Sequence, residues 1–222
     1  MSANNLFLVT SAVATEFGTG DRLTETIGTL ESIRKAIDAN IWLLDASPLP
    51  WDTKPVEGLV DRFLPIFDVT CQNVVKSGYG MSFVKSATEC HLMRRALKDI
   101  MPGQYDRIYK ISGRYRLTDE FTPHDGRNFT FLRPKPTGLS VEQCETNGMI
   151  MTRLYSFSGN LTDVASSVLS QISDYIWRVY TAGGVTDIEH GYFKYLPRHF
   201  VYFVDQIGVT GRIGHLISEV RE

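Results

Sequence analysis

Two hydrophobic patterns alternate along the chain: short apolar runs, and longer stretches in which apolar residues recur every three or four positions. Such runs are typical of buried parallel strands, and the longer spacing is typical of amphipathic helices. The runs predict strands at residues 6–10, 40–45, 66–69, 107–111, 128–132, 149–153 and 200–204. The spacing predicts helices at residues 23–37, 56–63, 81–100, 161–180 and 186–195. This alternation indicates an α/β fold, a single domain in which helices flank a mixed, mostly parallel sheet.

Residues 105–121 connect a predicted buried strand to a group of polar and charged side chains. The strand, residues 107–111, carries Ile and Tyr, and Ser112 and Gly113 end it. The following positions add charged and aromatic groups: Arg114, Tyr115, Arg116, Asp119 and Glu120. Ligands of open α/β sheets bind beyond the carboxyl ends of the strands, so a loop at this strand end predicts a binding edge. A surface loop with solvated charges is the alternative interpretation.

The composition is that of an ordinary globular chain. Hydrophobic residues make up 43% of the 222 residues and charged residues 22%, and the formal net charge is −2. This charge argues against a surface that is basic all over, but it is compatible with a local basic groove. The apolar run at residues 6–13 is too short to cross a membrane and lacks the basic start of a signal peptide, so the sequence predicts no transmembrane segment.

Three cysteines, Cys71, Cys90 and Cys144, are widely spaced and form no Cys-x-x-Cys pair. An odd number of cysteines at such spacings predicts neither a disulfide framework nor a zinc site. Free thiols are typical of reducing compartments, so we expect a cytoplasmic protein.

Four motifs follow one another in a recognisable order. A strand, a helix and a second strand lead to Asp45 in LLDAS, and the glycine turn KSGYGMS at residues 76–82 opens a long helix. The strand RIYKIS follows at residues 107–112, and the acidic segment DIEHGYFKYLP comes late, at residues 187–197. This order resembles the nucleotide-sugar-dependent glycosyltransferases of the GT-A fold, a Rossmann-like architecture.

The resemblance implies a nucleoside-diphosphate sugar as donor, bound by residues 1–121, and an acceptor bound by residues 122–222. It implies that Asp45 orients the nucleoside, and that Asp187 or Glu189 takes the proton of the acceptor hydroxyl, as an inverting transfer requires. The donor-binding residues that it implies are Thr10, Asp45, Lys76, Lys85, Ser112, Arg114 and Tyr115.

The chain departs from the family where the metal-binding Asp-x-Asp would fall, because residues 112–115 are Ser-Gly-Arg-Tyr. A divalent ion needs oxygen ligands, whereas an arginine neutralises a diphosphate directly through bidentate hydrogen bonds. We therefore expect either a metal-independent donor site, or Mn²⁺ or Mg²⁺ held by Asp119 or Glu120. The K-x-S-G-R-Y strand end, residues 110–115, resembles a group of small glycosyltransferase-like proteins, many encoded by phages and large viruses. A phage-encoded protein would act in the host cytoplasm.

The candidate residues also have structural interpretations. Thr186-x-x-Glu189 is a capping-box pattern, in which Glu189 serves only the helix start and Asp187 is left as the base. Asp45 precedes Ser-Pro, a common turn former. Solvation is the alternative for the two lysines, Lys76 and Lys85.

The sequence thus predicts a glycosyltransferase whose acceptor hydroxyl belongs to a modified DNA base, such as a hydroxymethylated pyrimidine, or to a surface glycan or lipid-linked saccharide. One rival is a sugar nucleotidyltransferase, because FGTGDRL at residues 17–23 is similar to the glycine-rich loop of that family. In this segment Asp21 or Thr19 is expected to cap the first helix. The other rival is a catalytically inactive binding module with the same fold, which the missing Asp-x-Asp favours.

Overall fold

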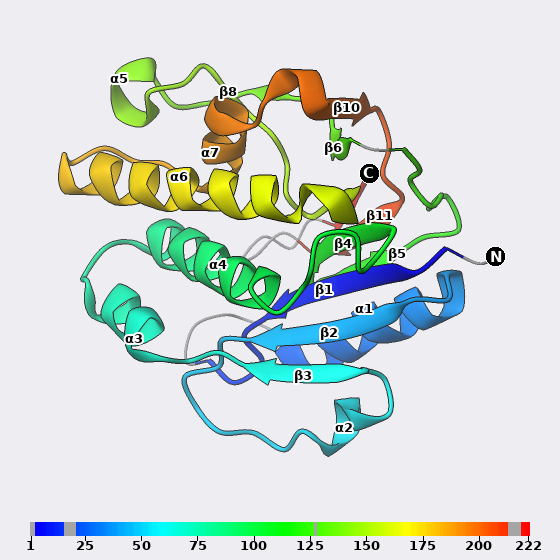
Figure 1. The fold of residues 1–222 in the computed structure, drawn as a ribbon. Coiled ribbons are helices and arrows are strands. Elements are labelled where there is room, and N and C mark those ends of the chain that lie inside the picture. The colour runs from blue at the N-terminus through cyan, green and yellow to red at the C-terminus, as the bar shows by residue number, and fades with distance from the viewer. Residues whose placement is uncertain (1–2, 16–20, 127, 213–218) are drawn as a thin grey trace.

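One seven-stranded sheet runs through the middle of the molecule (Figure 1). The computed structural model describes residues 3–15, 21–126, 128–212 and 219–222. The strands of this sheet are β1 (Asn5–Ser11), β2 (Asn40–Asp45), β3 (Arg62–Pro65), β4 (Arg107–Ser112), β6 (Phe129–Leu132), β9 (Leu154–Ser158) and β10 (Val201–Val204). Their order is β10-β6-β9-β4-β1-β2-β3. Within the described residues, β9 is antiparallel to both of its neighbours and the other pairs are parallel.

Helices cover both faces of this sheet. The helices are α1 (Arg22–Ala36), α2 (Lys54–Glu57), α3 (Val69–Lys76), α4 (Met81–Leu97), α5 (Val141–Cys144), α6 (Thr162–Thr181) and α7 (Ile188–Tyr195), with 3₁₀ turns η1 (Gly159–Leu161) and η2 (Arg198–Phe200). α4 packs against α6 on one face, with α3 beside α4 and α7 beside α6, and α1 lies on the other face (Figure 1). None of the described helices is both long and apolar enough to span a membrane.

β1 shows why the apolar runs form the centre of the sheet. Its side chains alternate between two cores: Leu6 and Leu8 join the cluster under α4 and α6, and Phe7 and Val9 join the cluster under α1. All four are fully buried. A strand covered on both faces needs apolar residues at every position, which is the continuous run that the sequence shows.

Two small sheets complete the fold. β5 (Tyr115–Leu117), β11 (Val209–Arg212) and β12 (Glu219–Arg221) form an antiparallel sheet in which β11 is central, and β5 contacts α1. β7 (Lys135–Pro136) pairs with β8 (Gly148–Met149). The prediction of a loop directly after Gly113 is therefore wrong for residues 115–117, because pairing with β11 turns them into a strand.

The predicted α/β fold with a mixed, mostly parallel sheet and flanking helices is confirmed. α1 follows the predicted apolar spacing, and the Asp21 side chain caps it by accepting a hydrogen bond from Thr24 N at 3.0 Å. Thr19, the other predicted cap, lies outside the described residues. The sheet takes strands from both predicted halves of the chain, which is what a single domain requires.

The predictions for residues 56–69 are wrong. The expected helix at 56–63 ends after one turn at Glu57, and residues 62–65 form β3 instead. The expected strand at 66–69 is absent: residues 66–68 form no helix or strand, and α3 starts at Val69, because the Asp68 carboxylate accepts hydrogen bonds from Thr70 N and Cys71 N and so caps a helix there. Asp68 was the local signal for the start of α3, but the apolar residues on either side of it are also typical of a strand.

The strand predicted at residues 149–153 is also misplaced, because the strand of the main sheet is β9, residues 154–158. Only Met149 belongs to a strand, the short β8. The apolar segment that follows is used for contacts with α7: Ile150 N donates a hydrogen bond to the Glu189 carbonyl at 3.1 Å. A long-range contact thus decides the path of a segment whose composition alone indicates a strand.

Candidate functional site

The strand order reverses its direction of growth at β1, which has β2 on one side and β4 on the other. Open α/β sheets bind ligands beyond the carboxyl ends of the strands at such a switch point. The last residues of β1 and β4 face each other there: Thr10 is paired with Ser112, and Gly113 N donates a hydrogen bond to the Thr10 carbonyl at 2.8 Å. Two predicted donor-binding residues, Thr10 and Ser112, therefore lie together at the expected edge.

Gly113 lets the chain leave β4 close to α1. A Cβ atom at this position would lie 3.1 Å from Thr26 Oγ1 and 3.2 Å from Ser11 Oγ. These two hydroxyls are 2.9 Å apart, and Thr26 Oγ1 donates to the Gly113 carbonyl at 3.3 Å. The Ser-Gly turn is thus held against the first part of α1, and the next residue, Arg114, leaves the sheet beside the start of that helix.

Arg114 and Arg22, the first residue of α1, bring two positive charges together. Burial lowers the pKa of Arg22 below its ordinary value, and the charge of Arg114 lowers it further. Arg22 has Glu25 as a partner at 3.2 Å, whereas the Arg114 guanidinium makes no hydrogen bond or ion pair with any of the described residues. Two arginines beside a helix N-terminus form an electropositive corner that favours an anion.

Lys110 is the buried centre of the edge. It is fully buried, and its Nζ donates to Ser112 Oγ at 3.0 Å and to the Thr152 carbonyl at 2.9 Å. It also forms an ion pair with Glu89 of α4 at 2.5 Å. Burial lowers the pKa of Lys110, and the charge of Glu89 opposes that change. Ser112 is therefore an acceptor for a buried cation, which positions the strand end.

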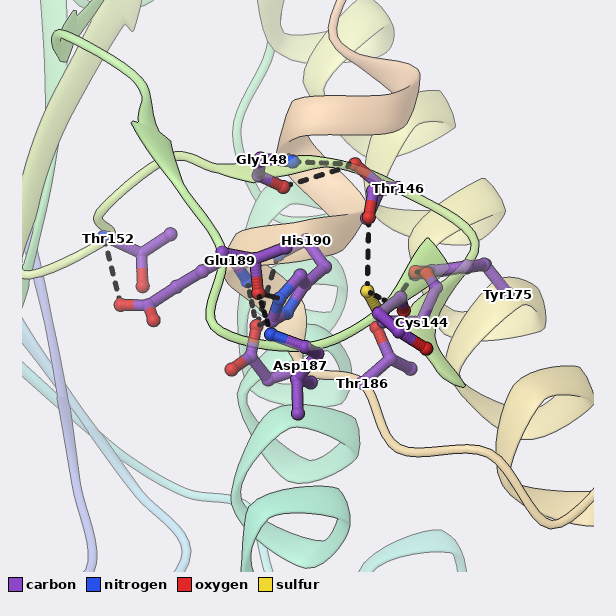
Figure 2. Close-up of polar contacts among 12 residues, drawn as sticks. Cys144, Thr146, Gly148, Thr152, Tyr175, Thr186, Asp187, Glu189 and His190 are labelled. Atoms are coloured by element: carbon purple, nitrogen blue, oxygen red, sulfur yellow. Dashed lines mark hydrogen bonds and ion pairs between the residues drawn. The ribbon is translucent and has the colours of Figure 1, made fainter. Parts of the chain in front are cut away.

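The start of α7 is capped by Asp187. Its carboxylate accepts hydrogen bonds from Glu189 N and His190 N, both at 3.0 Å, and lies 2.7 Å from His190 Nδ1 (Figure 2). The other nitrogen of the buried His190 ring is 2.7 Å from Thr137 Oγ1. Burial works to raise the pKa of Asp187, but the hydrogen bonds and charge of His190 and the backbone amides outweigh it and leave the pKa lowered.

The capping-box alternative for Thr186 and Glu189 does not hold. Thr186 Oγ1 turns away from the helix start and donates to Tyr175 Oη at 2.9 Å (Figure 2). The backbone at Asp187 is extended, so Asp187 itself becomes the N-cap. Asp187 rather than Glu189 therefore stabilises the start of α7, and the Glu189 carboxylate takes no part in the cap.

Glu189 reaches from α7 toward the carboxyl end of β4. Its Oε1 lies 3.5 Å from Thr152 N (Figure 2), and the carbonyl of Thr152 accepts a hydrogen bond from Lys110. Burial raises the pKa of Glu189, the charge of Asp187 raises it further, and Lys85 and Arg153 act in the opposite direction. The two carboxylates, two positions apart, thus have pKa values displaced in opposite directions, which is the arrangement expected of acid–base chemistry.

Asp45 lies at the carboxyl end of β2, and its own loop occupies it. The carboxylate accepts hydrogen bonds from Trp51 Nε1 and Ser47 Oγ, both at 2.8 Å, and from Val13 N at 3.2 Å. Burial raises its pKa, and these hydrogen bonds lower it by less. Asp45 therefore fastens the segments that follow β1 and β2 to each other.

The remaining predicted donor-binding residues, Lys85, Lys76 and Tyr115, differ in whether they reach this edge of the sheet. Lys85, in the second turn of α4, is exposed and interacts electrostatically with Glu189 and Lys110. Lys76, at the exposed end of α3, has no contact with this edge among the described residues. Tyr115 is buried in the core beneath α1, with the Arg153 guanidinium 5.8 Å from its ring centre. Of these three residues, only Lys85 is exposed and interacts with a residue of the site in the described part of the chain.

The acidic residues proposed as metal ligands are directed elsewhere. The side chain of Asp119 is fully exposed, 3.9 Å from Lys35. Glu120 binds Arg221 and Gln206, both at 2.8 Å. Within the described ranges, the only group of three potential metal ligands is Asp68, Cys71 and His91, so neither Asp119 nor Glu120 belongs to one.

Several residues of this edge were missed from the sequence, or were quoted only as letters of a motif. Lys110 was one of the latter, as the first letter of K-x-S-G-R-Y, and a charged residue inside an otherwise apolar alternation was the available signal. Arg22 follows the Asp21 cap, and its meeting with Arg114 depends on the tertiary fold. The glycine-rich segment at 17–23, on which the nucleotidyltransferase alternative depends, lies mostly outside the described residues.

A scan against protein-family models finds no match, and a search of curated proteins finds no significant relative.

Proposed function

We propose that the protein is a glycosyltransferase that uses a nucleoside-diphosphate sugar as donor and a hydroxyl group as acceptor. The observation that carries the proposal is Glu189, a carboxylate with a raised pKa and no ion-pair partner among the described residues, at the sheet edge where the strand order reverses. The GT-A-like order of motifs in the sequence supports the same assignment.

The electropositive corner of Arg22 and Arg114 suits the donor diphosphate. Charge develops on the diphosphate as the sugar leaves, and fixed guanidinium groups stabilise it without reorganisation. The Arg114 guanidinium has no ion-pair partner in the described part of the chain, and both arginines are only partly exposed, so the charge that they present is less screened than on an open surface. Two arginines in place of an acidic pair make the proposed donor site independent of a divalent metal.

The proposed reaction is a single displacement. The acceptor oxygen forms a bond to the anomeric carbon, the bond from that carbon to the diphosphate oxygen breaks, and the electron pair leaves with the diphosphate. Glu189 accepts the proton of the acceptor hydroxyl. Asp187 holds the start of α7 in place through its cap, and His190 links it to Thr137. Asp45 shapes the nucleoside side of the site by fastening the loops after β1 and β2.

We propose the same two acceptor classes as the sequence suggests: a modified DNA base, or a glycan or lipid-linked saccharide. A raised pKa at Glu189 suits either, because both offer an alcohol whose proton must be removed as the new bond forms. Transfer assays with hydroxymethylated DNA and with saccharides therefore separate these two acceptors.

The proposal is tested by thermal unfolding with a panel of nucleoside diphosphates and their sugars, each with Mn²⁺ and with chelator. A ligand that binds only the folded chain at a hundredfold excess over its Kd raises stability by about 2.7 kcal/mol. We expect one diphosphate to stabilise the wild type in chelator, Arg114→Ala to lose most of that effect, and the exposed control Arg133→Ala to keep it. If no nucleotide stabilises the folded protein, the proposal fails.

A further inference from the structure

Three side chains of different chemistry meet where α3 packs against α4, away from the proposed transfer site. One ligand atom from each of Asp68, Cys71 and His91 lies within 4.8 Å of the other two. Asp68 and Cys71 come from the start of α3, and His91 comes from the middle of α4. The fold thus brings a carboxylate oxygen, a thiol sulfur and an imidazole nitrogen to one point.

The Asp68 carboxylate is divided between two tasks. Oδ1 accepts hydrogen bonds from Thr70 N and Cys71 N and caps α3, while Oδ2 lies 2.9 Å from His91 Nε2. The cap fixes the carboxylate against Cys71, whose sulfur donates to the Ile66 carbonyl at 3.2 Å. Oδ2 and Nε2 are therefore held toward each other beside the thiol, and neither is needed for the helix cap.

The donor set is that of zinc. Zn²⁺ binds thiolate, imidazole and carboxylate ligands at about 2.3, 2.0–2.1 and 2.0–2.2 Å, in tetrahedral geometry. At these lengths, two tetrahedral nitrogen and oxygen ligands lie about 3.3 Å apart, close to the present separation of Asp68 Oδ2 and His91 Nε2. Binding would open this contact slightly and bring the Cys71 sulfur, which lies within 4.8 Å of both atoms, to about 3.6 Å from them.

An ion can reach this group from solvent. The side chains of His91 and Asp68 are 23% and 48% exposed, while Cys71 is buried behind them. A hollow of about 230 Å³ adjoins Asp68 and is lined by residues 64–68 and Arg95. Arg95 is directed to Asp99 at 2.9 Å, a carboxylate that it shares with Arg62 at 2.6 Å.

We infer that Asp68, Cys71 and His91 form a zinc-binding site with a water molecule as fourth ligand. On binding, the Cys71 thiol loses its proton to solvent and its hydrogen bond to Ile66, the Asp68–His91 hydrogen bond opens, and three bonds to Zn²⁺ replace them. The ion ties the start of α3 to the middle of α4. This site is independent of the proposed glycosyl transfer and carries no role in it.

The spacing of the cysteines could not predict such a site. Two ligands lie three residues apart at a helix start, but the third is on the next helix, and only one cysteine takes part. A rule that looks for cysteine pairs therefore predicts no zinc site here, and the structure indicates one.

Isothermal titration of the full chain with Zn²⁺ tests the inference. Asp68→Asn keeps the helix cap, because the amide oxygen still accepts from the two backbone amides, and it removes the charged ligand. His91→Ala removes the nitrogen ligand at a partly exposed position, and His199→Ala is its control at an exposed histidine outside the group. Titration with Ca²⁺ and Mg²⁺, which prefer oxygen ligands, checks the selectivity for a softer ion.

We expect one Zn²⁺ per chain for the wild type and for His199→Ala, and an affinity lower by about tenfold or more for Asp68→Asn and His91→Ala. Co²⁺ in the same site should show thiolate-to-metal charge-transfer absorption, which Cys71→Ser should remove. If Cys71→Ser does not fold, the first two variants still decide. Absence of Zn²⁺ binding by the wild type, or unchanged affinity in His91→Ala, would overturn the inference.

Discussion

Glu89 on α4 and Glu189 on α7 both lie beside Lys110, behind the carboxyl end of β4, but they differ in what compensates their charge. Glu89 is buried and forms an ion pair with Lys110 at 2.5 Å. Glu189 has no ion pair with any residue in the described ranges, and burial raises its pKa. A buried acid in an ion pair holds the fold together, and one without an ion-pair partner is left able to take and release a proton.

Residues that stabilise the fold and residues proposed to act in the reaction therefore lie next to each other at this edge. Lys110 forms an ion pair with Glu89 and donates a hydrogen bond to Ser112, while the Asp187 carboxylate caps α7. Among the described residues, the Glu189 carboxylate on one side and the Arg114 guanidinium on the other have no ion-pair partner. Three changes in stability test this division, from the largest expected effect to the smallest.

The largest effect is expected from Lys110→Met. This variant leaves the buried Glu89 without its cation, which should lower the free energy of unfolding by about 3–5 kcal/mol in denaturant titrations. The double variant Glu89→Leu/Lys110→Met replaces both charges by apolar groups of similar size, and we expect it to recover most of the loss. A double variant no more stable than the single one would show that the ion pair is not the reason for the burial.

A smaller effect is expected from Asp187→Ala, because it removes the cap of α7. Loss of an N-cap costs about 0.5–2 kcal/mol, and Asp187→Ser, which can still accept the backbone hydrogen bonds, should retain most of the stability. Chemical unfolding of both variants gives the comparison. Equal stability of the alanine and serine variants would contradict the capping role.

The smallest effect concerns the pH dependence of Glu189→Gln. Because the folded-state pKa of Glu189 lies above its ordinary value of 4.5, the folded chain binds this proton more tightly than the unfolded chain does. Wild-type stability should therefore fall as pH rises from about 4.5 through the raised pKa, by about 1.4 kcal/mol per unit of pKa difference. Glutamine does not ionise, so Glu189→Gln should exceed the wild type near pH 7 and match it below pH 4.5.

The control for this experiment is Glu31→Gln, at an exposed position of α1. Its stability should follow that of the wild type at every pH. A wild type that loses no stability relative to Glu189→Gln between acidic and neutral pH would mean that the Glu189 carboxylate is well solvated or paired.

The fold could be predicted from the sequence wherever one pattern was unopposed. The runs at β1 and β2 are apolar because both faces of these strands are covered, β4 has Ile and Tyr in alternation, and α6 has a clear apolar stripe. β3 and β9 were missed because the neighbouring segments at 66–69 and 149–153 are similarly apolar and equally typical of strands. At β9, contacts of residues 150 and 152 with α7 decide the path, and no local pattern records them.

Several residues that lie at this edge were singled out from the sequence, but the contacts that each of them makes were not. Ser112, Arg114 and the acidic start of α7 were singled out from strand ends and helix starts, and Ser112 and Glu189 both contact Lys110 or its acceptor Thr152. Asp187 rather than Thr186 caps α7 because the backbone at Asp187 is extended. Thr186 instead donates a hydrogen bond to Tyr175, a contact between distant parts of the sequence. The Lys110–Glu89 pair depends on how α4 is rotated on the sheet, which a local pattern does not show.

The most direct test of the central claim is the release of sugar from the donor by the wild type and by Glu189→Gln. The donor is the nucleoside-diphosphate sugar that stabilises the folded protein most, with water or an added hydroxyl compound as acceptor. We expect Glu189→Gln to bind this donor as the wild type does, and to release sugar about 10²- to 10⁴-fold more slowly, the usual contribution of a general base. An unchanged rate in Glu189→Gln, or no release by a wild type that binds the donor, would contradict the account, and the second result would favour a binding module.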